Sequence, residues 1–480
     1  MSMVVHAAVG THANETIHNW AGDLTSTPAK VVTVKDVADI VNAVTNRKAY
    51  PSPVRALGSH HSNTKVLLAD GGTVLEMREF DKILGHDDVK MTLTAQAGAL
   101  YIDTSMYLQE RGLMHYVNTE FGSLSSGAAS MVHTKDASFR GEHGQVSSYV
   151  VGVKMVQADG SLVTITEDDN PEEMHALRSS YGLLGIVYEV TYKIRPLQLM
   201  RLKHKSYTVD QFLANLDDIR ASEDSIMIYY FPYRDRLTVE FRSYIKDPGA
   251  DPSKPNMKLA KHGTTWQWRL RNFFWTTAYP RFSGFLAHKL PLPYKVRYWL
   301  AAKFNSFAML SMLLLKGSRT LPALQTNLYT EDVPKSARIT FSLFSFEVED
   351  YPKILREYYA FVQEYAKANK WRTTQPHVGY RIFQDNSAIL SHAAHGESIS
   401  IDPATVAGQP EWEPFLEEYN KFCSERNGTP LLNQTPVLKP EQAQAEGAYG
   451  KALPAFREAR KAADPEGRFL TPHLRDLLDL

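Results

Sequence analysis

The segment best suited to chemistry is the octapeptide Arg55-Ala56-Leu57-Gly58-Ser59-His60-His61-Ser62. Its small residues let backbone N–H groups approach and surround a pyrophosphate, and a histidine at its end can meet a ligand ring. The octapeptide follows a helical pattern and a break at Pro51 and Pro53. Taken alone, it is more typical of a surface loop with two incidental histidines, so its interpretation depends on the rest of the chain.

The common catalytic signatures are absent from the sequence. It has no GxxxxGK[ST] phosphate loop, no GxGxxG after a strand, no HExxH zinc helix and no GxSxG nucleophile elbow. A nucleotide triphosphatase, a Rossmann-type dehydrogenase, a zinc protease and an α/β-hydrolase are therefore disfavoured, and no metal site is expected.

Residues 31–190 combine short β-branched runs with helical patterns, which indicates an α+β region. The segment VKDVADIVNAVTNRK predicts a helix capped by Thr33 or Asp36. Two strands are predicted in YVVGVKMVQADGSLVTI, joined at Ala158-Asp159-Gly160, because Asp-Gly tolerates the positive φ of a tight hairpin. The alternating segment GIVYEVTYKIRP stops at Pro196. We therefore place a domain boundary near residue 197.

A second unit begins near Met200, with the strand patterns SIMIYYF, LTVEFRSYI and ARITFSLFSFEVE and the helical pattern KILREYYAFVQEYAKANK. Its middle is basic and aromatic: residues 252–330 contain no Asp or Glu. Trp and Tyr beside Lys and Arg suit an anionic membrane interface. They also suit a lid over a lipid-linked phosphate substrate. The alternative is a helical insertion packed on its own domain with solvated charges.

Composition bounds the class of protein. The chain has 480 residues, 43% hydrophobic and 22% charged, as in ordinary globular proteins of several domains. Lys+Arg and Asp+Glu are both 53, so no net field attracts nucleic acid. The single cysteine, Cys423, excludes a disulfide framework. The N-terminus does not read as a signal peptide, and the longest apolar stretch, residues 304–315, is too short to span a bilayer. We expect a cytoplasmic protein with at most peripheral membrane contact.

Four further segments support a functional interpretation of the octapeptide. They are Asn19-Trp20-Ala21-Gly22, VNTEFGSLSSGAASMVHTK (residues 117–135), Gly182-Leu183-Leu184-Gly185-Ile186-Val187, and Asp464-Pro465-Glu466-Gly467-Arg468-Phe469. Together they resemble FAD-linked oxidases with the vanillyl-alcohol-oxidase, or PCMH, type of FAD domain. The chain is most similar to the alditol oxidase, aldonolactone oxidase and decaprenylphosphoryl-ribose oxidase branch. The resemblance covers the FAD half well and the middle of the chain poorly.

The resemblance implies an FAD site. His61 aligns with the histidine that bonds covalently to the flavin 8α-methyl group in this family. The expected cofactor-binding residues are Arg55, Gly58, Ser59, His60, His61, Ser62, Ser123, Ser126, Ser130, His133 and Ile186. Thr134 stands where the family commonly has Gly after the histidine, and Lys135 follows it as in the polyprenyl-ribose branch.

The substrate side departs from the family pattern. The E-x-R motif of the cap strand aligns with Gly379-Tyr380-Arg381, so the arginine is kept and the glutamate is lost. Gln434 stands where alditol and polyprenyl-ribose oxidases have a lysine, although a gap leaves Lys439 as an alternative. Arg381 can stabilise an anion but is a poor base, so His133 or bulk water is expected to take the proton. The candidate catalytic residues are Arg381, Gln434, His133, Lys135 and Asn118.

The resemblance predicts a two-domain α+β fold. The FAD domain takes residues 1–197, a substrate-binding cap takes 198–434 with a basic aromatic helical insertion at about 252–330, and 435–480 return to the FAD domain. The predicted function is FAD-dependent oxidation of a CH–OH group in a carbohydrate-like substrate, such as a polyol or aldonolactone. Oxygen or an electron carrier would reoxidise the flavin.

Two other functions stay open. The first is a membrane-surface dehydrogenase or reductase acting on a polyprenyl- or sterol-like lipid, favoured by Lys135 and by the basic segment, whose residues 257–318 would contact the membrane. The second is a protein that binds flavin without turnover, because the substrate-site Glu and Lys are missing. No nucleic-acid partner is expected.

Overall fold

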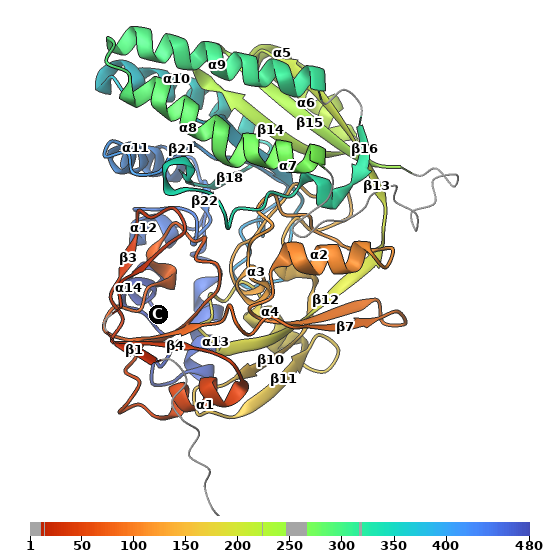
Figure 1. The fold of residues 1–480 in the computed structure, drawn as a ribbon, viewed down its shortest axis with the longest axis vertical. Helices are drawn as coiled ribbons and strands as arrows, with labels where there is room; N and C mark the ends of the chain where they lie inside the picture. Colours follow the sequence, from red (N-terminus) through yellow and green to blue (C-terminus); the bar gives the residue numbers. More distant parts are fainter. Residues whose placement is uncertain (1–10, 14, 223, 246–265, 316–318) are drawn as a thin grey trace, which may run out of the picture.

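The structure is a computed structural model that describes residues 11–13, 15–222, 224–245, 266–315 and 319–480. It has two halves (Figure 1). The N-terminal and C-terminal segments, which the sequence predicts to bind FAD, form the lower half in this view and are called the FAD half; the middle of the chain forms the upper half, called the cap half. The predicted two-domain α+β architecture is confirmed.

The first sheet of the FAD half has the order β1-β4-β6-β5, with bounds Thr11–Ala13, Lys30–Thr33, Thr73–Glu76 and Val54–Leu57. Strands β4, β6 and β5 are parallel. Helix α1 (Val37–Thr45) connects β4 to β5, and Asp36 caps it in a reciprocal arrangement with Asp39, so the Asp36 alternative for the cap is confirmed. The apolar face of α1 packs on the sheet through Ile40, Ala43 and Val44.

The second sheet of this half has the order β11-β10-β12-β8-β7, with bounds Leu162–Thr166, Val150–Val156, Ile186–Pro196, Thr92–Gln96 and Ile83–Asp87, and β9 (Leu113–His115) pairs with β12. The predicted hairpin is confirmed: β10 and β11 are antiparallel, and Gly160 in their turn has φ +89°. Smaller elements complete the half: β2 (Ile17–His18), β3 (Thr25–Ser26), η1 (Lys65–Leu67), α2 (Tyr101–Gln109), α3 (Ser126–Met131), η2 (Ser147–Tyr149) and α4 (Pro171–Leu177).

The cap half is built on an antiparallel sheet with the order β16-β13-β15-β14-β19-β20-β18-β22, with bounds Arg319–Pro322, Leu199–Tyr207, Arg236–Tyr244, Ser225–Phe231, His377–Ile382, Ser398–Ile401, Phe344–Glu347 and Thr429–Pro430. One face packs on helices α5 (Val209–Ala214), α6 (Leu216–Ala221), α10 (Tyr351–Asn369) and α11 (Trp412–Ser424) in the largest apolar cluster. The α10 helix was predicted and is confirmed. The other face carries Met227, Tyr229 and Tyr380 against Ala137 of the FAD half.

The basic aromatic segment is helical where the structure describes it; residues 252–265 and 316–318 lie outside the described residues. It forms α7 (Trp266–Phe273), the π-helical turn η4 (Phe274–Ala278), α8 (Tyr279–Gly284), a second π-helical turn η5 (Phe285–Lys289) and α9 (Tyr294–Leu315). These helices (green) lie in the cap half (Figure 1). Short elements follow: η6 (Ala323–Thr326), η7 (Lys335–Ala337), and β17 (Ile339–Phe341) paired with β21 (Ala404–Val406); η3 (Pro232–Arg234) links β14 and β15.

The C-terminal segment packs on the FAD half through α12 (Pro440–Ala443), α13 (Leu453–Ala463) and α14 (Pro472–Leu478). Arg468 joins it to helix α1 and the loop that follows: its buried guanidinium donates to the carbonyls of Ala43, Val44 and Tyr50 at 2.6–2.9 Å. The domain boundaries at residues 197 and 434 stay predictions; β12 ends at Pro196 and β13 begins at Leu199.

Candidate functional site

The octapeptide begins within β5, continues past its carboxyl end and lines a cavity in the FAD half. Opposite it lie α3, the start of β12 and residues 433–434. Much of the lining is small, which lets a large planar group approach the backbone: Ala56, Gly58, Ser59, Ala97, Ser125, Gly127, Ala128, Ala129, Gly182 and Gly185. Ile186 also lines the cavity, as do Ser59, His60, His61 and Ser62.

The lining fits FAD. Within the described part of the chain, Ser59 Oγ and Gln434 Oε1 are buried without a hydrogen-bond partner, so a ligand with polar groups would satisfy them. A Cβ on Gly58 would lie 1.7 Å from Ser125 Oγ, which shows how closely the octapeptide and the second loop approach each other. The cavity therefore combines a narrow backbone cradle with unpaired polar atoms, as a dinucleotide cofactor requires.

The Arg55 side chain, expected to bind the cofactor, is held by backbone carbonyls of the protein. Its buried guanidinium donates to the carbonyls of Gly182, Phe469, Val66 and Tyr181. Burial lowers its pKa to about 10. The side chain thus joins the octapeptide to the C-terminal return and to the strand lead-in, while the residue still lines the cavity.

The serines of the second loop lie behind the cavity wall. Ser123 Oγ accepts from the Thr330 N–H at 2.9 Å, and Ser130 Oγ donates to the Ser126 carbonyl at 2.8 Å. The wall itself is made by their neighbours in the loop: Leu124, Ser125, Gly127, Ala128 and Ala129. Ser123, Ser126 and Ser130 are not among the residues that line the cavity, and their expected contacts with FAD stay predictions.

His61 lies where two cavities meet, since it lines both. Its ring stacks on Trp20 with centroids 4.9 Å apart, and its Nε2 lies 3.1 Å from Thr330 Oγ1. Burial and the nearby His60, Arg338 and Arg78 lower its pKa to about 3, so the imidazole is neutral at physiological pH. His60 points elsewhere, toward His18 O and Glu76.

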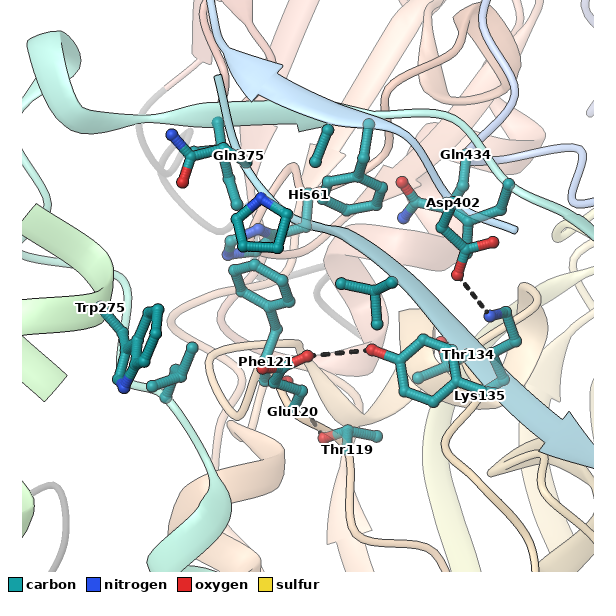
Figure 2. Close-up of a pocket in the computed structure, with 18 of the residues that line it drawn as sticks. His61, Thr119, Glu120, Phe121, Thr134, Lys135, Trp275, Gln375, Asp402 and Gln434 are labelled. Atoms are coloured by element: carbon teal, nitrogen blue, oxygen red, sulfur yellow. Dashed lines mark hydrogen bonds and ion pairs between the residues drawn. The ribbon is translucent and has the colours of Figure 1, made fainter. Parts of the chain in front are cut away.

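The second cavity lies between the FAD half and the cap sheet (Figure 2). It shares His61, Leu124, Thr134 and Gln434 with the first cavity. Its lining is mostly apolar and aromatic, including Phe121, Tyr229, Trp275, Tyr279, Leu328, Ile339, Phe341, Leu343, Val378, Tyr380 and Leu431. Gln434 lines the cavity, whereas the alternative Lys439 is exposed at the start of α12.

Polar groups concentrate at one side of this cavity. Lys135 Nζ lies 3.0 Å from Asp402 Oδ2 and 3.1 Å from Ser400 Oγ, and it sits over the Tyr380 ring. The Tyr380 hydroxyl donates to Glu120 Oε2 at 2.9 Å (Figure 2). Burial raises the pKa of Asp402 to about 6 and lowers that of Lys135, but their attraction opposes both shifts, so we assign an ionised pair. The pKa of Tyr380 is raised by burial, which keeps its hydroxyl protonated.

His133 lines the second cavity, but both of its ring nitrogens are engaged. Nε2 lies 2.5 Å from the Leu390 carbonyl and must donate, so Nδ1 accepts from the Tyr181 hydroxyl at 2.6 Å. Burial lowers the pKa of His133 to about 4. This environment disfavours the expected role of His133 as proton acceptor and makes the ring a junction between the second loop, Tyr181 and the Leu390 backbone.

Arg381 and Asn118 lie outside the cavity lining. Successive side chains of a strand alternate between faces, so Val378 and Tyr380 face the cavity and Arg381 faces away. Arg381 donates instead to Glu397 at 2.7 Å and to the Arg220 carbonyl at 2.8 Å. The structure thus disagrees with the expectation that Arg381 faces the flavin: the preceding residue, Tyr380, faces the cavity. Asn118 donates to Thr326 Oγ1 and lies beside a smaller cavity near Asp136.

Sequence reasoning missed Glu120, Tyr380 and Asp402. Glu120 lies in the second loop two residues after Asn118, and Tyr380 is the neighbour of Arg381. The alternation of β19 would have identified Tyr380 if its buried face had been known. Asp402 directly follows β20, a position at which a strand end can present a polar group, but nothing in the sequence places it beside Lys135.

The described residues contain no cluster of three His, Cys, Asp or Glu placed to hold a metal ion. No helix among residues 11–13, 15–222, 224–245, 266–315 and 319–480 has the length and apolar character of a bilayer span.

The fold and the adjoining cavities define a flavoprotein of the superfamily of FAD-linked oxidases with a PCMH-type FAD domain. Residues 28–166 match a family model described as FAD binding domain, and residues 190–477 match one described as D-arabinono-1,4-lactone oxidase. The second match covers more than half of the chain, which therefore belongs to the D-arabinono-1,4-lactone oxidase family.

Curated relatives are similar over part of their length. The chain is 24% identical to D-arabinono-1,4-lactone oxidase of Candida albicans over 288 residues, covering 56% of this chain and 50% of that protein. It is 26% identical to L-gulono-1,4-lactone dehydrogenase of Mycobacterium tuberculosis over 220 residues (45% and 50%) and 23% identical to L-gulonolactone oxidase of Mus musculus over 279 residues (56% and 60%). The alignments thus span about half the length of these relatives.

Solved structures of cholesterol oxidases share the fold. The enzyme from Brevibacterium sterolicum superposes with a TM-score of 0.73 at 14% identity, covering 100% of this chain and 99% of that one. A solvent-stable cholesterol oxidase gives 0.75 at 18% identity, with 98% of each chain covered. At these identities the likeness establishes the two-domain fold alone.

Proposed function

We propose that this protein is an FAD-dependent oxidoreductase that oxidises a CH–OH group of a sugar-lactone-like substrate. The observation that carries the proposal is the meeting of the two cavities at His61, Leu124, Thr134 and Gln434. A cofactor in the first cavity and a substrate in the second would touch across these four residues, as hydride transfer requires. The relatives named as aldonolactone oxidases and dehydrogenases support the substrate class.

Bound FAD would supply the hydride acceptor, with oxygen or an electron carrier removing the electrons afterwards. We propose that His61 holds it covalently. Attachment to the flavin methyl group needs a neutral imidazole with a free lone pair, and the low pKa of His61 provides the neutral form. In the tautomer in which Nε2–H donates to Thr330 Oγ1, Nδ1 keeps its lone pair and is the nitrogen available for the bond.

The polar side of the second cavity would handle the substrate hydroxyl. If the C–H hydride leaves while the hydroxyl keeps its proton, the product is an unfavourable protonated carbonyl; if the proton is removed first or together with the hydride, negative charge develops on the oxygen instead. Glu120 lines the cavity and can accept that proton, while the protonated Lys135 stabilises negative charge on the oxygen. Gln434, whose Oε1 has no partner among the described residues, can orient the substrate or the cofactor.

Acid precipitation tests the covalent bond. We expect flavin absorbance to stay with precipitated wild-type protein and with His60→Ala, but to enter the supernatant for His61→Ala. His60 is the matched control because it neighbours His61 and points toward Glu76. Release of flavin from the wild type would refute the covalent part and leave FAD binding intact.

Anaerobic flavin bleaching with a substrate panel tests the reaction. We expect an aldonolactone to reduce the flavin and a saturated hydrocarbon analogue to leave it oxidised. Flavin that no compound reduces would refute the oxidation and favour binding without turnover.

The apolar and aromatic lining of the second cavity favours a second candidate substrate, a hydroxylated lipid. A sterol or polyprenyl alcohol in the same panel distinguishes the two candidates. In either case we propose a cytoplasmic location and a peripheral membrane contact within residues 257–318, of which the structure describes 266–315.

A further inference from the structure

Exposed apolar side chains concentrate on helices α7–α9. Among the described residues, twelve large hydrophobic side chains are exposed, and nine of them fall between residues 266 and 307. They are Trp266, Leu270, Phe273, Phe282, Phe285, Leu292, Val296, Trp299 and Phe307, with exposures from 41% to 70%. A cluster of this size, containing six aromatic side chains, is characteristic of an interaction surface rather than of scattered exposure.

The exposed side chains follow helical spacing, so each helix presents them on one face. Trp266, Leu270 and Phe273 are four and three residues apart, and Val296 and Trp299 are three apart. The opposite faces are buried: Trp268 Nε1 donates to the Asn327 carbonyl at 2.9 Å, and Tyr298 is 4% exposed. The helices are thus already packed on the cap, and their outer faces form a second, separate apolar surface.

The same surface is positively charged. Exposed basic residues lie among the aromatic ones, and residues 252–330 contain no Asp or Glu to neutralise them. The exposed basic residues are Arg269, Arg281, Lys289, Lys295 and Lys303, and Lys303 Nζ lies over the Trp299 ring.

The positive charge indicates which kind of partner binds this surface. A second copy of the chain would bring the same exposed basic residues against these, and like charges in apposition are unfavourable. An anionic lipid surface supplies the opposite charge, headgroup-level sites for Trp and a hydrocarbon layer for Phe and Leu. Apolar and cationic groups on adjacent helix faces match the two layers of such a surface.

Helices α7 and α8, which carry part of this surface, also line the second cavity. Arg271, Trp275 and Tyr279 line that cavity, and they belong to the same run of α7, η4 and α8 that exposes Leu270, Phe273 and Phe282. In Figure 2, Trp275 lies on the opposite side of the cavity from Lys135 and Asp402. One helical segment therefore joins the exterior apolar face to the apolar side of the cavity.

We propose that the outer faces of α7, α8 and α9 dock on a bilayer of anionic lipids. Docking brings the apolar side of the cavity toward the lipid surface, from which a substrate can enter. The docking goes beyond the proposed oxidation and does not depend on it, because vesicle binding is measured without turnover.

Flotation of the full chain with phosphatidylglycerol–phosphatidylcholine vesicles tests the docking. A charge variant, Arg281→Gln/Lys295→Gln/Lys303→Gln, removes three exposed basic residues that do not line the cavity. Each basic residue near an anionic surface contributes about 1 kcal/mol, so each substitution is expected to weaken partitioning about fivefold and the three together about a hundredfold. An apolar variant, Phe273→Ser/Phe282→Ser/Trp299→Ser, is expected to lose binding even at low salt.

The matched control carries the same kind of change elsewhere: Leu84→Ser/Val89→Ser/Leu162→Ser alters the three exposed large hydrophobics of the FAD half. We expect it to bind as the wild type does, and phosphatidylcholine vesicles alone to bind weakly. Failure of the wild type to float, or equal losses for the control and surface variants, would overturn the proposal. A wild-type dimer that the apolar variant dissociates would assign the surface to a second copy and also overturn it.

Discussion

Gly58 is the residue whose replacement the structure constrains most sharply. Gly58→Ala would place a methyl group 1.7 Å from Ser125 Oγ and 2.5 Å from Ser125 Cβ, but 3.8 Å from its Cα. Rotating Ser125 can move the hydroxyl but leaves Cβ too close, so the octapeptide and the second loop must separate. Overpacking of this kind costs about 1–3 kcal/mol. If the separation falls on the FAD cavity that both loops line, FAD affinity drops about 5- to 150-fold.

The assay is the FAD content of purified protein, measured with FAD titration into apoprotein prepared from a His61→Ala background. Removing the Ser125 side chain leaves only the ordinary 3.8 Å contact, so Gly58→Ala/Ser125→Gly is expected to recover FAD binding. Gly396→Ala is the matched control, because a Cβ there meets nothing within 4 Å. Normal affinity in Gly58→Ala, or a folded double variant that fails to recover, would refute the reasoning.

Three further results are expected. Lys135→Met removes the cation beside the proposed substrate oxygen and should slow flavin reduction at saturating substrate by about a hundredfold; an unchanged rate would contradict this. Arg381→Gln should leave the KM and kcat nearly unchanged while lowering the free energy of unfolding by about 2 kcal/mol, because its ion pair with Glu397 faces away from the cavity; a tenfold loss of kcat in a stable variant would restore a catalytic role. The free energy of unfolding should fall as the pH drops from 6.5 toward 4, by up to about 1.4 kcal/mol per pH unit for each buried neutral histidine, because the unfolded chain binds the protons that the folded chain excludes. The raised pKa values of Asp136 and Asp402 offset part of this loss, and equal urea midpoints at pH 7.5 and 5 would contradict it. The buried histidines include His61, His115 and His377, with pKa values lowered to about 3, His133, with a pKa lowered to about 4, and His392, whose pKa is lowered well below its usual value by burial.

The main features of the FAD half could be predicted from the sequence because each depends on neighbouring residues. The octapeptide, the Asp-Gly hairpin and the capped helix each depend on a few consecutive residues with strong backbone preferences. A short loop at the end of a strand can place its residues only close to that end of the sheet. The predicted positions of Gly58, Ser59, His60, His61 and Ile186 along one cavity follow from this.

The substrate side was harder because its geometry depends on strand register and long-range pairing. On β19, a shift of one residue exchanges the faces, so the arginine of the aligned motif faces Glu397 while Tyr380 faces the cavity. The Lys135–Asp402 pair joins residues 267 positions apart, and no local pattern signals such a contact. The helices of the basic segment were expected, but which of their faces is exposed became clear only from packing.

The hydrogen bonds that join the segment around Arg55 to the segment around Arg468 have a consequence for biosynthesis. Val54 donates its N–H to the Arg468 carbonyl, and Arg55 donates to the Phe469 carbonyl, so the strand beneath the octapeptide is held by residues made more than 400 positions later. Asn433 likewise accepts the N–H of Asn63 through its carbonyl. While the ribosome is still translating the cap, the nascent FAD half lacks these supports. We therefore expect the cavity to bind its cofactor only after residue 469 has left the exit tunnel. Cofactor loading would then follow the synthesis of nearly the whole chain.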